Sequence, residues 1–170
     1  CDADWAPECE KAALTRDATG VYTATFTLPA GDYEYKVAEG GSWDTSYGQG
    51  GAPGGANIAY SLKQETAVTF YYNQSTHRVW NTVTDQMVTL PGSEQQALGC
   101  SDNWKPDCLA PLMEPTGNGT YTYETTALPE GTYELKVAIG GSWDENYGQD
   151  GAAGGANYQF ATKANKLVTF

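Results

Sequence analysis

The chain has 170 residues, a net charge of −12 and a pI of about 4.2, with only nine lysines and arginines. Nucleic acids and anionic membranes attract basic patches, so this charge balance excludes both as partners. No apolar run reaches the length of a transmembrane helix. No signal peptide precedes Cys1, which predicts a processed or excised piece of a longer protein.

The chain opens with a short cysteine loop, and a second loop of the same length begins at residue 100. Cys1 and Cys9 enclose DADWAPE, and Cys100 and Cys108 enclose SDNWKPD. Four cysteines allow three pairings, and the identical spacing favours Cys1–Cys9 and Cys100–Cys108. Zinc is the alternative, although neither pair has a second pair at ligand spacing and His77 is the single histidine. Disulfides predict an oxidising location, and therefore a secreted or cell-surface protein.

Short runs of alternating apolar and polar residues fill the rest of the chain, and none has a helical period. Glycine, proline and asparagine clusters separate these runs, as turns require. The pattern predicts an all-β chain of two tandem antiparallel β-sandwich modules of immunoglobulin-like architecture. The predicted strands are Tyr22–Leu28, Tyr33–Ala38, Ala67–Tyr72, Thr76–Trp80, Met87–Leu90, Tyr121–Leu128, Tyr133–Ala138 and Leu167–Phe170.

A 27-residue segment occurs twice. It reads GDYEYKVAEGGSWDTSYGQGGAPGGAN at Gly31–Asn57 and GTYELKVAIGGSWDENYGQDGAAGGAN at Gly131–Asn157, with 20 of 27 positions identical. A period near one hundred residues exceeds a solenoid unit and suits one small domain. We predict two copies of one module, residues 1–82 and 87–170. The predicted strand Met87–Leu90 has no counterpart in the first copy. Either flanking residues have been lost from the sequence, or a strand is exchanged between the two copies or between two chains.

The repeated strand presents a lysine in both copies. In Tyr33–Val37 alternate side chains face opposite sides, which places the apolar ones inward and Lys36 outward. Tyr133–Val137 repeats this pattern with Lys136 outward. Leucine replaces tyrosine at the inward position of the second copy, as a core tolerates, whereas the outward lysine is unchanged.

Tryptophans lie in polar or glycine-rich surroundings near this strand. Trp43 and Trp143 follow Gly-Gly-Ser, and Trp5 and Trp104 lie inside the cysteine loops. An exposed indole covers the apolar face of a pyranose ring, while lysine and carboxylate groups bind its hydroxyls. The alternative is that the tryptophans fill the sandwich core and the lysine is an ordinary solvated residue.

Two long runs resemble the starch-binding domains of glucoamylases and related amylases: LPAGDYEYKVAEGGSWD at Leu28–Asp44 and LPEGTYELKVAIGGSWD at Leu128–Asp144. Nearly all of each copy resembles the small β-domains appended to bacterial pullulanases and amylopullulanases, through SWDENYG, GGAN and the FYY…TH strand pair. The resemblance implies one sugar site per copy, built from the tryptophan of the cysteine loop, the strand lysine and the tryptophan beyond it. Those residues are Trp5, Lys36 and Trp43, and Trp104, Lys136 and Trp143.

Four further side chains complete the candidate carbohydrate site. Asp44 and Asp144 follow the loop tryptophans, and Tyr47 and Tyr147 lie in the same loops. The carboxylates are candidates for sugar hydroxyls, and the tyrosines either extend the platform or support it.

Other polar and aromatic residues have less specific expectations. Asn57 and Asn157 follow two glycines, and we expect them to hold turns rather than contact a ligand. We expect His77 to be a surface strand residue. Trp80 is either a second platform in the first copy or a seal at the linker.

The sequence predicts a binding module and not an enzyme. A glycosidase needs two carboxylates in a cleft, and each copy is too small for a deep one; no metal or other cofactor is expected. The predicted function is non-catalytic binding of starch-type α-glucans, α-1,4-linked and including α-1,6-branched chains, with starch, amylopectin, pullulan or maltooligosaccharides as ligands. The parent would be a larger amylolytic enzyme or a cell-surface complex. The alternative is a structural spacer or protein-interaction module without a sugar site.

Overall fold

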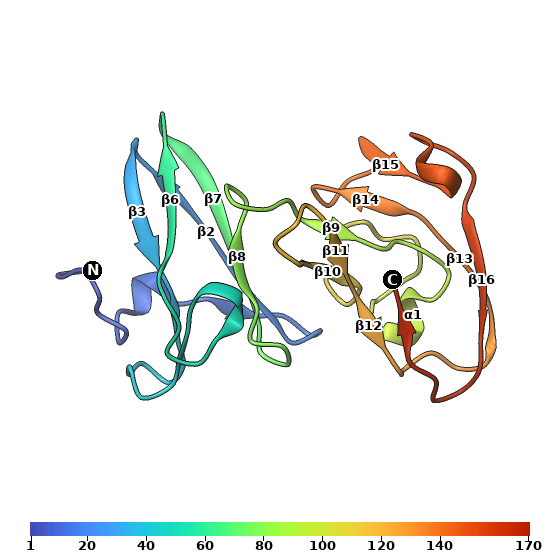
Figure 1. The fold of residues 1–170 in the computed structure, drawn as a ribbon, viewed down its shortest axis with the longest axis horizontal. Helices are drawn as coiled ribbons and strands as arrows, with labels where there is room; N and C mark the ends of the chain where they lie inside the picture. The colour runs from blue at the N-terminus through green and yellow to red at the C-terminus, as the bar shows by residue number, and fades with distance from the viewer. The chain divides into compact units, whose positions relative to one another are not determined.

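The computed structural model describes all residues from Cys1 to Phe170, which form two compact units, Cys1–Asp85 (unit 1) and Gln86–Phe170 (unit 2). Both units consist of short strands that pair antiparallel, with only brief helical turns (Figure 1). The prediction of an all-β antiparallel chain is therefore confirmed. No helix is long and apolar enough to span a membrane.

Unit 1 has eight strands in three sheets, of orders β1-β2-β7-β8, β3-β6 and β4-β5. The longest pairing joins β2 and β7 over eight residue pairs, from Val21 opposite Asn73 to Leu28 opposite Thr66. The elements are η1 (Glu10–Ala12), β1 (Thr15–Arg16), β2 (Val21–Leu28), β3 (Gly31–Tyr35), β4 (Val37–Ala38), β5 (Ser46–Tyr47), η2 (Gln49–Gly51), β6 (Ile58–Leu62), β7 (Thr66–Asn73) and β8 (Val79–Asn81).

Unit 2 has nine strands, of orders β11-β10-β9-β14-β15, β12-β17 and β13-β16. Strand β9 lies between β10 and β14 and joins them into one five-stranded sheet. The elements are β9 (Val88–Thr89), α1 (Gln95–Leu98), β10 (Leu112–Pro115), β11 (Tyr121–Thr122), β12 (Glu124–Thr125), β13 (Gly131–Leu135), β14 (Val137–Ile139), β15 (Glu145–Tyr147), η3 (Gln149–Gly151), β16 (Tyr158–Thr162) and β17 (Val168–Thr169).

The core of unit 1 is mainly aromatic. Tyr35 packs edge-on against Phe70 at a centroid distance of 4.8 Å. Trp80 is buried and stacks on Tyr71 at 5.3 Å. Trp80 is therefore a core side chain, and its role as a second sugar platform is excluded.

The core of unit 2 is mainly aliphatic. Val88, Leu90, Met113 and Leu135 form a buried cluster. Burying each of these side chains contributes about 1.5–3 kcal/mol relative to leaving it exposed. Strand β9 supplies Val88 to this cluster, which explains why the short apolar run before the second cysteine loop is part of the fold.

Several predicted strands differ from the observed ones. Tyr33–Ala38 divides at Lys36 into β3 and β4, and Tyr121–Leu128 divides into β11 and β12. Strands β6 and β16 were not predicted. Each follows a glycine-rich loop and pairs with a strand that comes before that loop, β3 for β6 and β13 for β16.

The expectation for His77 was wrong. His77 lies in the turn between β7 and β8, with a left-handed φ of 59°. Its ring stacks on Tyr47 at 4.0 Å, and its Nδ1 is hydrogen-bonded with the Tyr72 hydroxyl. These contacts hold the histidine half-buried at the edge of the unit 1 core.

Both cysteine loops are closed by disulfides. Cys1 bonds Cys9 and Cys100 bonds Cys108, with Cα atoms 5.8 and 6.0 Å apart. The structure therefore agrees with the pairing that the spacing favours. Closing so short a loop contributes about 2–3 kcal/mol in the chain-entropy account.

Candidate functional site

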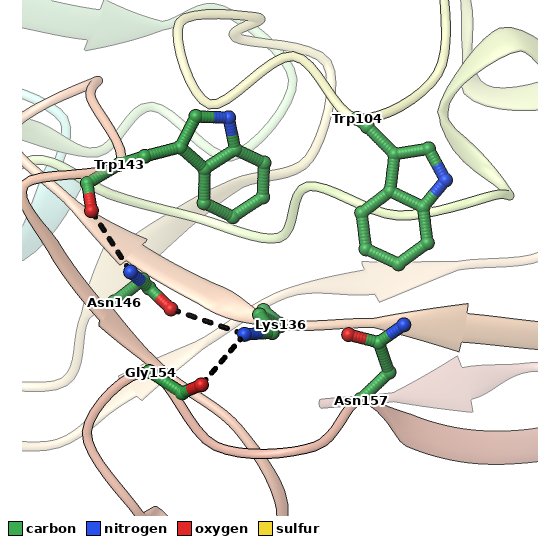
Figure 2. A pocket seen from close by; sticks show the side chains of 6 residues that line it. All are labelled: Trp104, Lys136, Trp143, Asn146, Gly154 and Asn157. Atoms are coloured by element: carbon green, nitrogen blue, oxygen red, sulfur yellow. Dashed lines mark hydrogen bonds between the residues drawn. The ribbon is translucent and has the colours of Figure 1, made fainter.

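An open pocket of about 410 Å³ lies on unit 2 (Figure 2). Three of its lining residues were predicted from the sequence, and three were not. The predicted ones are Trp104, Lys136 and Trp143, and the others are Asn146, Gly154 and Asn157.

The two indoles form an apolar platform along one side of this pocket. The ring centroids of Trp104 and Trp143 are 6.5 Å apart, and the ring planes are tilted by 34°. Trp143 is 41% exposed, although it is among the largest apolar side chains of the unit. In Figure 2 the amide side chains of Asn146 and Asn157 and the Lys136 ammonium lie across the pocket from the two rings.

The segment before the second cysteine loop holds Trp104 in place. The Trp104 amide donates to the carbonyl oxygen of Gly92 at 3.1 Å. The buried side chain of Gln95 accepts from the Lys105 amide and donates to the Lys105 carbonyl, both at 2.7 Å. These bonds and the disulfide keep Trp104 at a φ of 60°, a conformation that costs a residue other than glycine about 1–3 kcal/mol.

The loop that carries Trp143 is shaped by its own polar side chains. The Ser142 hydroxyl donates to Asp144 Oδ2 at 3.0 Å, and Ser142 Oγ accepts from the Asp144 amide at 3.2 Å. Asp44 makes the same contacts with Ser42 in unit 1. Asp144 is not among the residues that line the pocket. The structure thus gives both carboxylates a part in loop geometry, and their contact with sugar hydroxyls stays a prediction.

Lys136 lies where the chain passes from one sheet to another. Strand β13 pairs with β16 and ends at Leu135, whereas β14 begins at Val137 and pairs with β9 and β15. At this corner the Lys136 amide donates to the Pro91 carbonyl at 2.9 Å. The change of sheet re-aims the lysine side chain into the pocket, as a break in a regular strand does. Lys36 has the same position between β3 and β4.

The Lys136 ammonium has two neutral oxygen partners. Its Nζ donates to Asn146 Oδ1 at 3.3 Å and to the Gly154 carbonyl at 3.2 Å (Figure 2). No carboxylate lines the pocket. The positive charge is therefore available to a polar ligand, and the pocket offers binding groups rather than an acid–base pair.

The glycine-rich loop after β15 reaches the pocket because Gly148 permits a close approach. A Cβ atom at Gly148 would lie 2.1 Å from the Ala156 carbonyl oxygen, which no side chain tolerates. The same distance recurs at Gly48 in unit 1. This close approach folds the loop back and brings Gly154 and Asn157 beside Lys136.

The expectation for the asparagines after this loop was wrong. Asn157 lines the pocket, and its Nδ2 donates to Glu134 Oε2 at 2.9 Å rather than to the backbone. Asn57 Nδ2 likewise donates to Glu34 Oε2 at 3.0 Å. A signal was present in the sequence, since the outward glutamate and the asparagine recur together in both copies.

The two loop tyrosines do not extend the platform. Tyr47 is buried, with its ring stacked on His77 at 4.0 Å and packed against Tyr72 at 5.9 Å, so it supports the loop rather than extending the platform. Tyr147 is half-buried and donates to Glu145 Oε1 at 2.9 Å, which raises the pKa of the Tyr147 hydroxyl. Tyr147 does not line the pocket.

Unit 1 repeats the platform with its own loops. Trp5 and Trp43 are 49% and 42% exposed, and their ring centroids are 6.1 Å apart with a tilt of 48°. The Trp43 indole donates to the Trp5 carbonyl at 3.3 Å, and Lys36 Nζ donates to the Gly55 carbonyl at 2.6 Å. The alternative that these tryptophans fill the sandwich core is excluded in both units.

No group of three or more histidine, cysteine, aspartate or glutamate side chains is placed to hold a metal ion. A second pocket, of about 360 Å³, lies on β3 and β6 of unit 1 and contains neither a tryptophan nor a lysine. The pocket of unit 2 is thus the place where predicted residues from separate loops converge.

The sequence matches one protein family over nearly its whole length. Residues 1–79 and 87–170 each match the family model described as the pullulanase X25 domain. The two matches correspond to the two halves of the chain.

Three amylopullulanases are similar to this chain. Those of Thermoanaerobacter thermohydrosulfuricus, Thermoanaerobacterium thermosulfurigenes and Thermoanaerobacterium saccharolyticum are 37%, 32% and 30% identical over 178 residues. The alignments cover 99% of this chain but only 12%, 9% and 14% of those proteins. The chain therefore corresponds to a small segment of the curated relatives that it matches.

Among solved structures, the pullulanase from Bacillus acidopullulyticus is similar at a TM-score of 0.43 and 23% identity, over 93% of this chain and 16% of that one. The resemblance to pullulanase-appended domains is confirmed by the family match. The chain belongs to the pullulanase X25 domain family and is a tandem, non-catalytic accessory module.

Proposed function

We propose that this X25 chain binds starch-type α-glucans, α-1,4-linked and including α-1,6-branched chains, at one shallow site in each unit. The observation that carries the proposal is the pocket of unit 2, where the indoles of Trp104 and Trp143 face the ammonium of Lys136 across open space. Trp143 is 41% exposed and Trp104 is half-buried beside it, and apolar surface gathered in one patch is typical of interaction sites.

The chemistry of the pocket suits a glucose ring. The apolar face of the sugar covers an indole, and at about 25 cal/mol per Å² an overlap of some tens of Å² contributes about 1–2 kcal/mol. The Lys136 ammonium and the Asn157 amide supply donors and acceptors for the hydroxyls, and each net hydrogen bond adds about 1 kcal/mol. Sites of this kind bind in roughly the micromolar to millimolar range.

Two linked sites suit a polymeric ligand. Starch presents many chain ends on one surface, so the second binding event takes place at a high effective concentration. The names and lengths of the amylopullulanase relatives support a place within a larger amylolytic enzyme. The two disulfides support a secreted or cell-surface location. On this proposal the module holds its parent on starch.

The test replaces one platform tryptophan in each unit. The double variant Trp43→Ala/Trp143→Ala should lose retention on insoluble starch, and each single variant should weaken retention, because only its intact site still binds. Leu167→Ala is the matched control, because Leu167 is 62% exposed and lies outside the pocket. Unchanged retention of the double variant would refute the site. A parent chain without any retention would favour a structural spacer or a protein-interaction module.

A further inference from the structure

The two candidate sites differ at one position whose side chain, in unit 2, is hydrogen-bonded to the lysine and to the tryptophan loop. Within the repeated 27 residues only seven positions differ, and one of them is Ser46 in unit 1 against Asn146 in unit 2. Asn146 lines the pocket together with Lys136 and Trp143. Since the surrounding sequence is nearly identical, this position is a natural comparison between the two sites.

Asn146 connects the platform to the lysine. Its Nδ2 donates to the Trp143 carbonyl at 2.8 Å, and its Oδ1 accepts from Lys136 Nζ at 3.3 Å (Figure 2). One planar amide therefore fixes the loop that carries an indole and the ammonium that lies opposite. No other side chain of unit 2 bonds to both.

Ser46 makes neither of these bonds. The backbone frame is the same, because the Ser46 carbonyl accepts from the Gly54 amide at 2.8 Å and the Asn146 carbonyl accepts from the Gly154 amide at 2.9 Å. In unit 1, however, the Lys36 ammonium turns to the Gly55 carbonyl at 2.6 Å. The serine side chain is too short to join the lysine to the tryptophan loop.

The difference changes how far each site is ordered before a ligand arrives. A long lysine side chain loses rotamer freedom when it is held in place, and a ligand that finds it already held does not bear that cost. In unit 2 two acceptors hold the Lys136 ammonium and leave its remaining N–H for the ligand. In unit 1 a single acceptor holds Lys36.

We infer that unit 2 is the tighter of the two glucan sites and that Asn146 is the positioning residue responsible. The inference rests on the proposed function and deepens it. The expected ratio of affinities is about three- to tenfold, which is the factor that one net hydrogen bond contributes.

The experiment compares the sites one at a time in the full chain, with a maltooligosaccharide as the probe and calorimetric titration as the readout. Trp43→Ala leaves the site of unit 2, and Trp143→Ala leaves the site of unit 1. The Trp43→Ala chain should bind the probe three- to tenfold more tightly than the Trp143→Ala chain.

Exchanging Asn146 and Ser46 between the units distinguishes an effect on the position of the lysine from an effect on the stability of the fold. Asn146→Ser, placed in the Trp43→Ala chain, should weaken binding to the level of unit 1, with an unchanged unfolding temperature. Ser46→Asn, placed in the Trp143→Ala chain, should strengthen binding by the same factor, a gain that damage to the fold does not produce. Asn146→Ala should weaken binding as much as Asn146→Ser, because both remove the amide.

The outcomes distinguish this inference from the proposed function. Equal affinities of the two single-site chains, or exchanges without effect in a parent that binds the probe, would overturn the inference alone. A parent chain that does not bind the probe at all would overturn the proposed function and the inference with it.

Discussion

The two units follow one sequence plan, yet they fill their interiors differently. Where unit 1 has Tyr35, packed edge-on against Phe70 and Tyr60, unit 2 has Leu135 in an aliphatic cluster. Where unit 1 has Glu39, which accepts a hydrogen bond from Tyr72, unit 2 has Ile139 packed against its core. The corresponding positions therefore carry side chains of different size and polarity, each with its own packing partners.

The surface loops show the opposite behaviour. Trp43 and Trp143 recur in identical Gly-Gly-Ser-Trp-Asp segments, and both remain more than two-fifths exposed. An exposed indole contributes little to folding, so the fold alone does not explain why both copies have it. The comparison shows that the exposed tryptophan loop is the same in the two units, whereas side chains of the core differ.

The largest expected effect contrasts a core tryptophan with a platform tryptophan. Trp80→Ala should destabilise unit 1 by about 3–5 kcal/mol, because it empties a buried site beside Tyr71. Trp143→Ala should cost less than about 1 kcal/mol, because its ring is already largely in water. Urea unfolding of each variant measures both values. Similar losses for the two variants would contradict the assignment of Trp143 to the surface.

The next effect concerns the stability of unit 2, which contains a buried glutamate whose carboxylate makes no hydrogen bond. Glu94 is 1% exposed, and neither carboxylate oxygen has a hydrogen-bond partner. Burial raises its pKa from 4.5 to about 7. Its carboxyl group lies against the backbone of Gly92, where an added Cβ would meet Glu94 Oε2 at 2.2 Å. Burial and the charge of Glu94 raise the pKa of the Tyr123 hydroxyl.

The sign of the resulting pH dependence follows from these values. Between pH 4.5 and about 7 the unfolded chain has released this proton while the folded unit still holds it. Unit 2 should therefore lose stability as the pH rises through this range, by up to about 3 kcal/mol. Glu94→Gln should remove this loss and be more stable than the parent at pH 8. Urea unfolding of both chains at pH 5 and pH 8 is the measurement, and an equal pH dependence of the two would refute the role of Glu94.

The sequence predicted those parts of the structure that depend on local patterns. Alternating residues predicted β2 and β7, and equal spacing favoured the disulfide pairs. Glycine-rich surroundings predicted that Trp43 and Trp143 are exposed. Each of these inferences needed only neighbouring residues or a comparison of the two copies.

The parts that were missed depend on long-range contacts. Alternation predicted that Lys136 faces outward, but it did not reveal the change of sheet partner at Lys136, which divides the predicted strand Tyr133–Ala138 into β13 and β14. Asn157 reaches the pocket only because Gly148 lets the loop fold back on itself. Tyr47 is buried by His77, which comes from a distant hairpin turn. In each case a partner far along the chain decides the position of the side chain.

The most direct test of the account follows the five indole N–H resonances while a maltooligosaccharide is added. Four tryptophans belong to the two platforms, and Trp80 is an internal control because its buried indole N–H has no ligand-accessible surface and no hydrogen-bond partner. We predict that the resonances of Trp43 and Trp143 shift together with those of Trp5 and Trp104, while that of Trp80 stays fixed. Platform resonances that do not move at millimolar sugar would contradict the central claim that these four indoles form the binding surface.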